Sequence, residues 1–385
     1  MKTAFRAAAL AALALAAACS TYNPLKWAGI IHEPAHPPTP LAPIDAKLTP
    51  TAVWCASVGK GEGLNLRPAI EGGKVYAAAA DGTISVLAED DGHLISKLET
   101  KKPIAGGLEV AEGGRILAGT LKGEVIAVDA GGGKVLWASH VAGEVIAPPA
   151  VSRDIVVART ADGRMFGFSL ADGKRLWVYQ RPTPSLLLRS PAGVIAIGGD
   201  VVAGYPNGKL IALDIADGKL IWEVTVTLPR GATELERIAD VAGLPVIDGS
   251  NICAAAYQGK VACFEIATRN VLWSRDISTA RSLAIDAKNL YLVDDNGAVH
   301  AVDKKTGASV WKQDKLLYRG LTRPVVFDGK VAVGDVEGFV HVLSPEDGSI
   351  VGRLATDGTP IVSLVPGLSG LFVQTAGGAL LRVRY

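Results

Sequence analysis

The sequence predicts an all-β protein folded as an eight-bladed β-propeller, in which each blade is a four-stranded antiparallel sheet. The first observation is composition. The 385 residues include 44 glycines and are 49% apolar, a combination typical of short strands joined by tight turns. The second is a pattern of fifteen residues, from a glycine to a tryptophan, that returns along the chain. The third is a strand sequence near the N-terminus that completes the last copy of the pattern.

The copy at 208–222 shows how each unit is built. A turn at 206–208 leads into an alternating strand at 210–214, and a second turn at 216–218 leads into a strand that ends in Trp222. A β-branched run also lies upstream of each unit, so four strands fall in roughly 40 residues, the size of a propeller blade. Because one blade cannot bury both faces, we expect blades to stack around an axis with the tryptophans between them. The five full copies cover 123–137, 163–177, 208–222, 259–273 and 297–311.

Counting the units predicts eight blades over residues 47–385. The copies that open at Gly82 and Gly338 lack the tryptophan, and the copy that opens at Gly378 stops before its outer strand. The segment around Trp54 has the pattern of an outer strand without a unit of its own, so we expect it to complete the eighth blade and close the ring. Seven blades is the alternative if the copy at Gly82 is not a full blade. The opening glycines, 38 to 51 residues apart, are Gly82, Gly123, Gly163, Gly208, Gly259, Gly297, Gly338 and Gly378.

Residues 1–46 are predicted to direct and tether the protein. Two basic residues precede a twelve-residue apolar stretch at 7–18, which is too short to cross a bilayer and is typical of a signal peptide, assigned to 1–18. The stretch ends in "LAAACS", which resembles a bacterial lipobox and implies lipidation of Cys19; a simple signal peptide with an incidental cysteine is the alternative. Ser20 after this cysteine favours the periplasmic face of the outer membrane. The proline-rich stretch that follows predicts an extended tether over 19–46.

Four further segments carry a more specific resemblance: "LLLRS" at 186–190, "ATELERIADVAGLP" at 232–245, "LYLVDDNGAVHAVD" at 290–303 and "LTRPVVFDGKVAVGDVEGFVHVL" at 321–343. Through them the chain resembles the propellers with quinoprotein-type repeats and, among these, the BamB family of lipoproteins. That family belongs to the machine that inserts β-barrels into the bacterial outer membrane. The resemblance implies a non-enzymatic scaffold that aids insertion of outer-membrane proteins.

Two neighbouring junctions between blades are long. Trp177 and Gly208 are 31 residues apart and Trp222 and Gly259 are 37 apart, whereas the other junctions measured in this way span 24 to 27 residues. Since consecutive blades present equivalent junctions on one face, we expect the two insertions to lie side by side. Thr233 and Glu236 have the spacing of a capping box, which predicts a helical turn over 234–240. The leucines at 186–188 either face outward as an interaction patch or fold inward beneath their loop.

The family resemblance implies which residues bind a partner. In BamB proteins a leucine-x-leucine-arginine loop and an aspartate on the next long junction contact a POTRA domain of BamA, the central barrel subunit. The corresponding positions here are Leu186, Leu188, Arg189 and Asp240, while Ala242 stands where the family has a second aspartate. Other subunits of the BAM complex, and unfolded outer-membrane protein clients that pair with exposed strand edges, are further expected partners.

Enzymatic chemistry has little support in the residues. A quinone-dependent (PQQ) dehydrogenase or a ligand-binding propeller is the alternative function, but the chain has no Cys-Cys pair, and its Asp294–Gly297 run fits a hairpin turn better than a calcium loop. We therefore predict no cofactor, no metal and no catalytic residues. The 39 basic and 38 acidic residues do not favour nucleic acid as a partner. Cys253 and Cys263 flank a turn predicted at two residues, which would oppose Cys253 to Phe264 and leaves open whether they form a disulfide or remain thiols.

Overall fold

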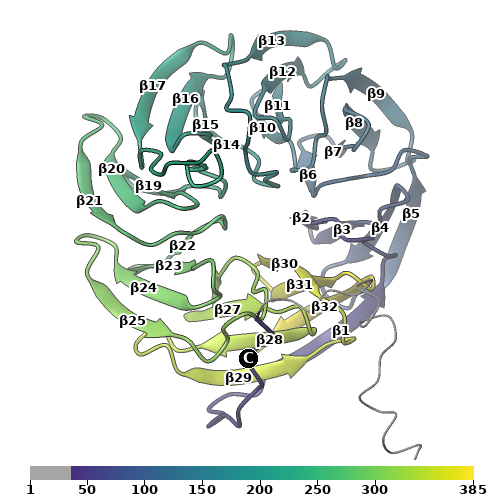
Figure 1. The fold of residues 1–385 in the computed structure, drawn as a ribbon. Helices are drawn as coiled ribbons and strands as arrows, with labels where there is room; N and C mark the ends of the chain where they lie inside the picture. The colour runs from purple at the N-terminus through teal and green to yellow at the C-terminus, as the bar shows by residue number, and fades with distance from the viewer. Residues whose placement is uncertain (1–35) are drawn as a thin grey trace, which may run out of the picture.

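The computed structural model describes residues 36–385, which form eight four-stranded antiparallel sheets arranged in a ring (Figure 1). This arrangement confirms the eight-bladed propeller, and the seven-bladed alternative is wrong because the weak copy at Gly82 lies within a complete blade. Within 36–385 there is no helix with the length and apolar character needed to cross a membrane.

Blades 1 to 4 each contain four strands that are consecutive in the chain. Their bounds, from the ring axis outward, are β2 (Ala69–Glu71), β3 (Lys74–Ala78), β4 (Thr83–Ala88) and β5 (Leu94–Glu99) in blade 1; β6 (Leu108–Ala111), β7 (Arg115–Gly119), β8 (Glu124–Asp129) and β9 (Val135–His140) in blade 2; β10 (Ala150–Ser152), β11 (Ile155–Arg159), β12 (Met165–Ser169) and β13 (Arg175–Tyr179) in blade 3; β14 (Ile195–Ile197), β15 (Asp200–Tyr205), β16 (Lys209–Asp214) and β17 (Leu220–Thr225) in blade 4.

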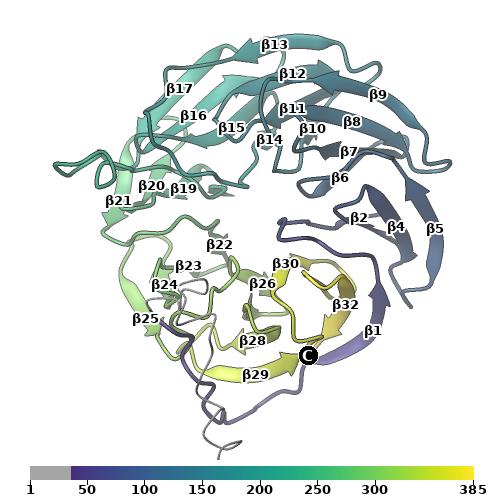
Figure 2. The same ribbon diagram turned by 45° about the vertical axis from the view of Figure 1, so that its right-hand side comes forward.

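Blade 8 differs from the others because it combines both ends of the described chain. Strand β1 (Thr51–Ser57) pairs antiparallel with β32, and Figures 1 and 2 show the purple β1 alongside the yellow C-terminal strands. The predicted closure of the ring is therefore confirmed.

The remaining bounds are β18 (Val246–Asp248), β19 (Asn251–Ala255), β20 (Val261–Glu265) and β21 (Val271–Arg275) in blade 5; β22 (Ala284–Ile285), β23 (Asn289–Val293), β24 (Val299–Asp303) and β25 (Ser309–Gln313) in blade 6; β26 (Val325–Phe327), β27 (Lys330–Gly334), β28 (Phe339–Leu343) and β29 (Ile350–Ala355) in blade 7; β30 (Ile361–Pro366), β31 (Leu371–Thr375) and β32 (Ala379–Arg384) in blade 8.

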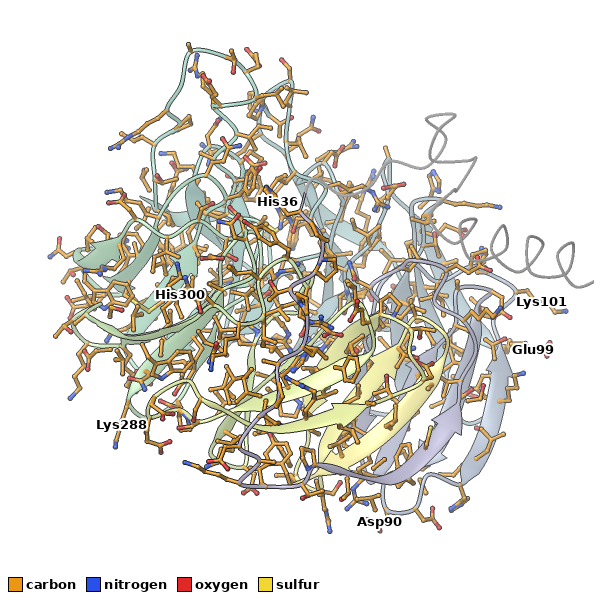
Figure 3. All side chains as sticks on the ribbon, turned by 60° about the horizontal axis from the view of Figure 1, so that its bottom comes forward. His36, Asp90, Glu99, Lys101, Lys288 and His300 are labelled. Carbon is orange, nitrogen blue, oxygen red and sulfur yellow. A yellow bond between two sulfur atoms is a disulfide. The ribbon has the colours of Figure 1, made fainter. Side chains whose placement is uncertain are left out.

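The ring has two faces with different connections. Because successive strands run antiparallel, junctions between blades and the turns between second and third strands share one face, which we call the junction face. Turns between first and second strands, and between third and fourth, lie on the opposite face, which we call the turn face. Figure 3 shows the turn-face residues Asp90 and Lys288 low in the view, below the junction residue Lys101 and below His36.

The hydrophobic core lies between the blades. Middle strands such as β3 and β4 are almost wholly buried, whereas the outer strand β5 is mostly exposed. One continuous cluster joins side chains of blades 1 and 2, including Ile84 and Ile116. Each blade therefore depends on its neighbours for burial, as a ring of stacked repeats requires.

The tryptophans lock each blade onto the next one. Trp177 of blade 3 donates its indole N–H to the Ile215 carbonyl of blade 4 at 2.8 Å, and its ring lies beneath Gly218, where a Cβ would be 2.6 Å from the indole. Gly218 also has a φ of +72°, so glycine is required there for two reasons. Four other tryptophans make the same bond to the next blade: Trp54, Trp137, Trp273 and Trp311.

Residues 36–50 pack against blades 6 and 7 as a segment that we call the strap. Residues 36–46 fall within the predicted tether, and their contacts with the ring were not predicted. His36 stacks on Tyr318 with ring centroids 4.5 Å apart, and Thr39 and Ala42 accept hydrogen bonds from Arg319 and Arg353 at 2.8 and 3.2 Å. Figures 1 and 2 show the strap passing the outer strand β29 on its way to β1. The described chain thus begins on the junction face.

The loss of a tryptophan makes room for the strap. Gly352 stands in blade 7 where other units have tryptophan, and a Cβ there would be 2.9 Å from Pro50 Cδ and closer still to Leu48. The backbone N–H groups of Lys47 and Leu48 donate to the Val351 carbonyl at 2.9 and 3.1 Å, which fixes the crossing point. The missing tryptophan does not by itself predict the crossing, because blade 1 has Ser96 at the same position without a crossing segment of the described chain.

Restoring the tryptophan should displace the strap. We expect Gly352→Trp to overpack the crossing and cost about 1–3 kcal/mol of stability, with residues 36–48 becoming accessible to limited proteolysis. Ser96→Trp is the matched control, since Ser96 stands at the equivalent position of blade 1, where the described chain has no crossing segment. Equal protection of the strap in both variants would contradict this prediction.

The register predicted for the cysteine hairpin is wrong. The turn between β19 and β20 contains three residues, with Ala256 N–H donating to the Lys260 carbonyl at 2.9 Å, rather than two. The extra residue opposes Cys253 to Cys263 instead of Phe264, and the two cysteines form a disulfide across the buried strand pair. This outcome resolves the alternative that was open in the sequence.

Candidate functional site

The two long junctions meet on the junction face. Residues 180–194 join β13 to β14, and residues 226–245 join β17 to β18. The Leu188 N–H donates to Asp240 Oδ2 at 2.8 Å, and the Ser190 hydroxyl donates to the Ala242 carbonyl. The space between them is only about 10 Å³, room for about one water molecule. The predicted side-by-side arrangement is confirmed, and the two junctions form one packed surface.

The leucine loop, residues 186–190, shows both of the orientations that the sequence left open, one for Leu186 and the other for Leu187 and Leu188. Leu186 faces solvent and is 41% exposed, whereas Leu187 and Leu188 are half-buried beneath the loop. Arg189 is exposed beside them. The loop thus presents one apolar side chain and one guanidinium outward, and uses the other two leucines to hold its shape.

The second junction contains the predicted capping box in a single helical turn. Glu236 N–H donates to Thr233 Oγ1 at 3.2 Å, and Thr233 N–H donates to Glu236 Oε2 at 3.1 Å. The turn covers 234–237, so it is shorter than the predicted span to 240. It exposes Leu235, and Leu228 at the start of the junction is also exposed. Apolar side chains therefore lie on both long junctions.

Asp240 holds the leucine loop and is not itself exposed. Only 5% of this residue is accessible, and its carboxylate accepts hydrogen bonds from the Leu188 N–H and, at 3.3 Å, from the Asn207 N–H. Burial raises the pKa of Asp240 above its ordinary value, while the two backbone donors and Arg159 oppose that shift. The structure places this residue as a support of the surface, a role that sequence reasoning did not assign to it.

A third junction contributes Glu144, which the sequence analysis missed. Arg189 Nε lies 2.8 Å from Glu144 Oε2, on the junction between β9 and β10. This junction has ordinary length, so no departure from the repeat marks it. Both side chains are largely exposed, and water weakens their attraction. The ion pair orients the guanidinium while leaving it accessible to a stronger carboxylate partner.

Below the junctions, Arg159 braces the site. Its Nη1 donates to the Ala192 carbonyl at 3.1 Å, and its guanidinium lies 5.6 Å from the centre of the Tyr205 ring. Burial lowers the pKa of Arg159, and Tyr205 and Asp240 offset part of that shift. Arg159 thus ties blade 3 to the first long junction and to Tyr205 of blade 4.

His300 and His341 each pair with an aspartate of the same blade. His300 lies 2.9 Å from Asp294, and His341 lies 3.0 Å from Asp335, at matching positions of blades 6 and 7. Asp294 also accepts from the Asn296 and Ala298 N–H groups, as the predicted hairpin turn requires. Over residues 36–385, no group of three or more histidine, cysteine or acidic side chains is placed to hold a metal ion. The predicted signal peptide (1–18) and the lipidation site Cys19 lie outside the described residues.

Comparisons with known proteins agree with the geometry. Residues 80–313 match the family described as "Outer membrane protein assembly factor BamB". A protein of that name from Bordetella pertussis is 39% identical over 333 residues, which are 86% of this chain and 86% of the relative. The crystal structure of BamB from Moraxella catarrhalis has a TM-score of 0.80 and 28% sequence identity, over 88% of this chain and 100% of that one.

The propeller is also similar to that of enzymes. A quinohemoprotein alcohol dehydrogenase from Comamonas testosteroni has a TM-score of 0.69 at 12% identity, over 87% of this chain and 76% of that one. At this identity the likeness concerns the fold alone, because one fold hosts many functions.

Proposed function

The chain belongs to the BamB family of outer membrane protein assembly factors, and from that membership we propose that it is a non-enzymatic scaffold docked to the POTRA region of BamA through its junction face. It acts in outer-membrane protein assembly, as its relatives are named to do. The observation that supports the docking site is the direct packing of the two long junctions, which presents Leu186 and Arg189 together.

The chemistry of this surface suits a protein partner. Leu186 is an apolar anchor, and Leu235 and Leu228 add apolar area on the second junction. Arg189 provides planar donors that can bind a carboxylate with two hydrogen bonds, in exchange for its exposed pair with Glu144. The surface is also held in one shape before binding, because Asp240 fixes Leu188 and the partner need not order the loop.

The absence of catalysis belongs to the same proposal. The polar side chains of the docking surface act in loop support and in the exposed Arg189–Glu144 ion pair, rather than as a nucleophile and base in contact. The quinone-binding alternative can be tested by mixing the purified protein with pyrroloquinoline quinone and calcium. Stoichiometric retention of the quinone absorbance after gel filtration would support it over the scaffold.

Attachment to the outer membrane is expected to depend on Cys19. The strap brings the chain onto the junction face at His36, so the segment from the proposed lipid anchor joins the ring on the same face as the docking surface. Palmitate labelling of the intact protein, with Cys19→Ala as the control, tests the anchor. Labelling of both proteins would show that another residue carries the lipid.

Reversing the charge of Arg189 should abolish capture of the partner. We expect Arg189→Glu to weaken binding of BamA by at least about tenfold, because a central anchor typically contributes about 2 kcal/mol or more. The measurement is a pull-down followed by titration with the isolated POTRA region. Arg153→Glu is the matched control, an exposed arginine on the turn face. Undiminished capture by folded Arg189→Glu protein would remove the interface assignment.

Asp240→Ala separates positioning from contact. This change leaves the exposed charges unaltered but removes the acceptor of the Leu188 and Asn207 N–H groups. We expect faster amide exchange at Leu188 together with weaker capture of BamA. Weaker capture with unchanged exchange would show instead that Asp240 contacts the partner directly.

A further inference from the structure

The turn face carries an exposed leucine in blade 8. The Gly367 N–H donates to the Gly370 carbonyl, so the turn from first to second strand has two residues, Leu368 and Ser369, as in blades 1 and 7. The tip of this loop is Leu368, whose side chain is fully exposed. A soluble surface has no folding reason to place a leucine at the tip of a turn, where polar residues and glycine are usual.

The loop is rigid despite its exposure. The Ser369 carbonyl accepts hydrogen bonds from two arginines, at 2.9 and 3.1 Å from Arg382 and at 2.7 Å from Arg384. The Ser369 hydroxyl donates to Glu89, and the Gly367 N–H donates to the Gly370 carbonyl at 2.9 Å. A preorganised apolar tip loses little conformational entropy when it is covered, which is the property of a docking anchor.

Beside this loop lies a groove of about 1070 Å³ that we call the turn-face groove. Blades 1, 7 and 8 line it. Its apolar wall includes the rings of Phe327 and Tyr385, which pack edge to face with centroids 5.5 Å apart. The groove is open along its rim, where Glu71 and Asp328 are exposed, whereas small-molecule sites enclose most of their ligand. An extended segment fits this shape better than a small molecule.

The charge of the groove selects the occupant. Its lining contains three carboxylates, Glu71, Glu89 and Asp328, against the single guanidinium of Arg384, which already donates to Ser369. The field therefore favours positive charge. We propose that the turn-face groove, with Leu368 as its anchor, docks an extended polypeptide segment in which apolar side chains alternate with basic ones. This site is independent of the proposed docking of BamA, which uses the opposite face.

Fluorescence anisotropy with two labelled synthetic peptides tests the proposal, one alternating leucine with lysine and one alternating leucine with glutamate. We expect the lysine peptide to bind the intact protein at least about tenfold more tightly than the glutamate peptide. Leu368→Asp should weaken binding of the lysine peptide by about tenfold or more. The matched control is Leu235→Asp, an exposed leucine of the junction face. Leu368 is fully exposed, so its variant should keep the wild-type melting temperature.

Equal binding of the lysine peptide to both leucine variants would overturn the proposal. Sedimentation analysis tests a second occupant: if the protein self-associates and Leu368→Asp makes it monomeric, a second copy of this chain fills the groove and the proposal is wrong. Capture of BamA distinguishes the two sites. Leu368→Asp should still capture BamA, and Arg189→Glu should still bind the lysine peptide. The two assignments can therefore be refuted independently of each other.

Discussion

Arg319→Met should destabilise the propeller by about 3–5 kcal/mol, the range expected when one partner of a buried ion pair is removed. Arg319 is only 1% exposed. Its Nε donates to Asp335 Oδ2 at 2.7 Å, another nitrogen pairs with Glu337, and Nη1 donates to the Thr39 carbonyl of the strap. The substitution leaves the buried Asp335 carboxylate without its cation. Urea unfolding at neutral pH measures the loss.

Arg353→Met is the control for this prediction. Arg353 also donates to the strap, at 3.2 Å to the Ala42 carbonyl, but it is less buried and forms no ion pair with a described carboxylate. We expect it to cost less than about 1.5 kcal/mol. The double variant Arg319→Met with Asp335→Asn should lose less than the sum of its parts, because the uncompensated charge is gone. If Arg319→Met lost no more stability than Arg353→Met, water would already solvate the Asp335 carboxylate and the prediction would be wrong.

The cluster of Arg319, Asp335 and His341 also determines how the stability of the fold changes at low pH. Burial opposes ionisation of Asp335, but hydrogen bonds from His341, the Phe339 N–H and Arg319 outweigh it and hold the pKa of Asp335 below its ordinary value of 3.8. Because the pKa of this carboxyl is lower in the folded protein than in the unfolded one, its ionisation stabilises the fold at pH values above the unfolded-state pKa. That stabilisation is lost as the pH falls through the folded-state pKa. Removing Arg319 weakens this contribution, so the acid unfolding midpoint of Arg319→Met should lie at higher pH than that of the wild type.

Trp177→Ala should also cost about 3–5 kcal/mol, since it opens a cavity between blades 3 and 4. The indole is buried beneath Gly218 and donates to the Ile215 carbonyl. Trp177→Phe keeps most of the side-chain volume but removes the indole hydrogen bond. The Ile215 carbonyl is then buried without a donor, which costs about 1–3 kcal/mol. Guanidinium unfolding curves of both variants measure these costs.

Trp222 offers a matched comparison within the same chain. Its neighbour in blade 5 is Arg269, which has a φ of +63° where blades 1–4, 6 and 7 have glycine. Among the described residues, the Trp222 N–H has no hydrogen-bond partner of the kind that Trp177 has. Trp222→Phe should therefore cost less than Trp177→Phe. Equal costs would mean that packing alone, and not the indole bond, joins the blades.

The ring was predictable because its signals are local and repeated. A glycine at the turn and a tryptophan at the outer strand define each unit, and the unpaired strand at Trp54 predicts the closure. The cysteine register failed for a local reason: whether a turn contains two or three residues depends on backbone angles, such as the φ of +48° at Gln258, that the residue types did not indicate.

The functional surface was predictable only where the repeat is interrupted. Long junctions revealed the loops that meet at Leu188 and Asp240, but the burial of Asp240 depends on the packing of three chain segments. Glu144 was not found because its junction has normal length. The strap was hidden for a similar reason, since its composition is that of a tether and the missing tryptophan at Gly352 is shared with Ser96 of blade 1, which no described segment crosses.

The pairing of β1 with β32 has a consequence for biosynthesis. Strand β1 is synthesised well before β32, so blade 8 cannot form in a nascent chain until β32 has emerged. Until Arg384 has emerged, blades 1 and 7 each lack a neighbour on one side. A chain crossing a membrane N-terminus first thus keeps its ring open until β32 has crossed, and a product truncated before β32 is left with exposed apolar surface that proteases can recognise.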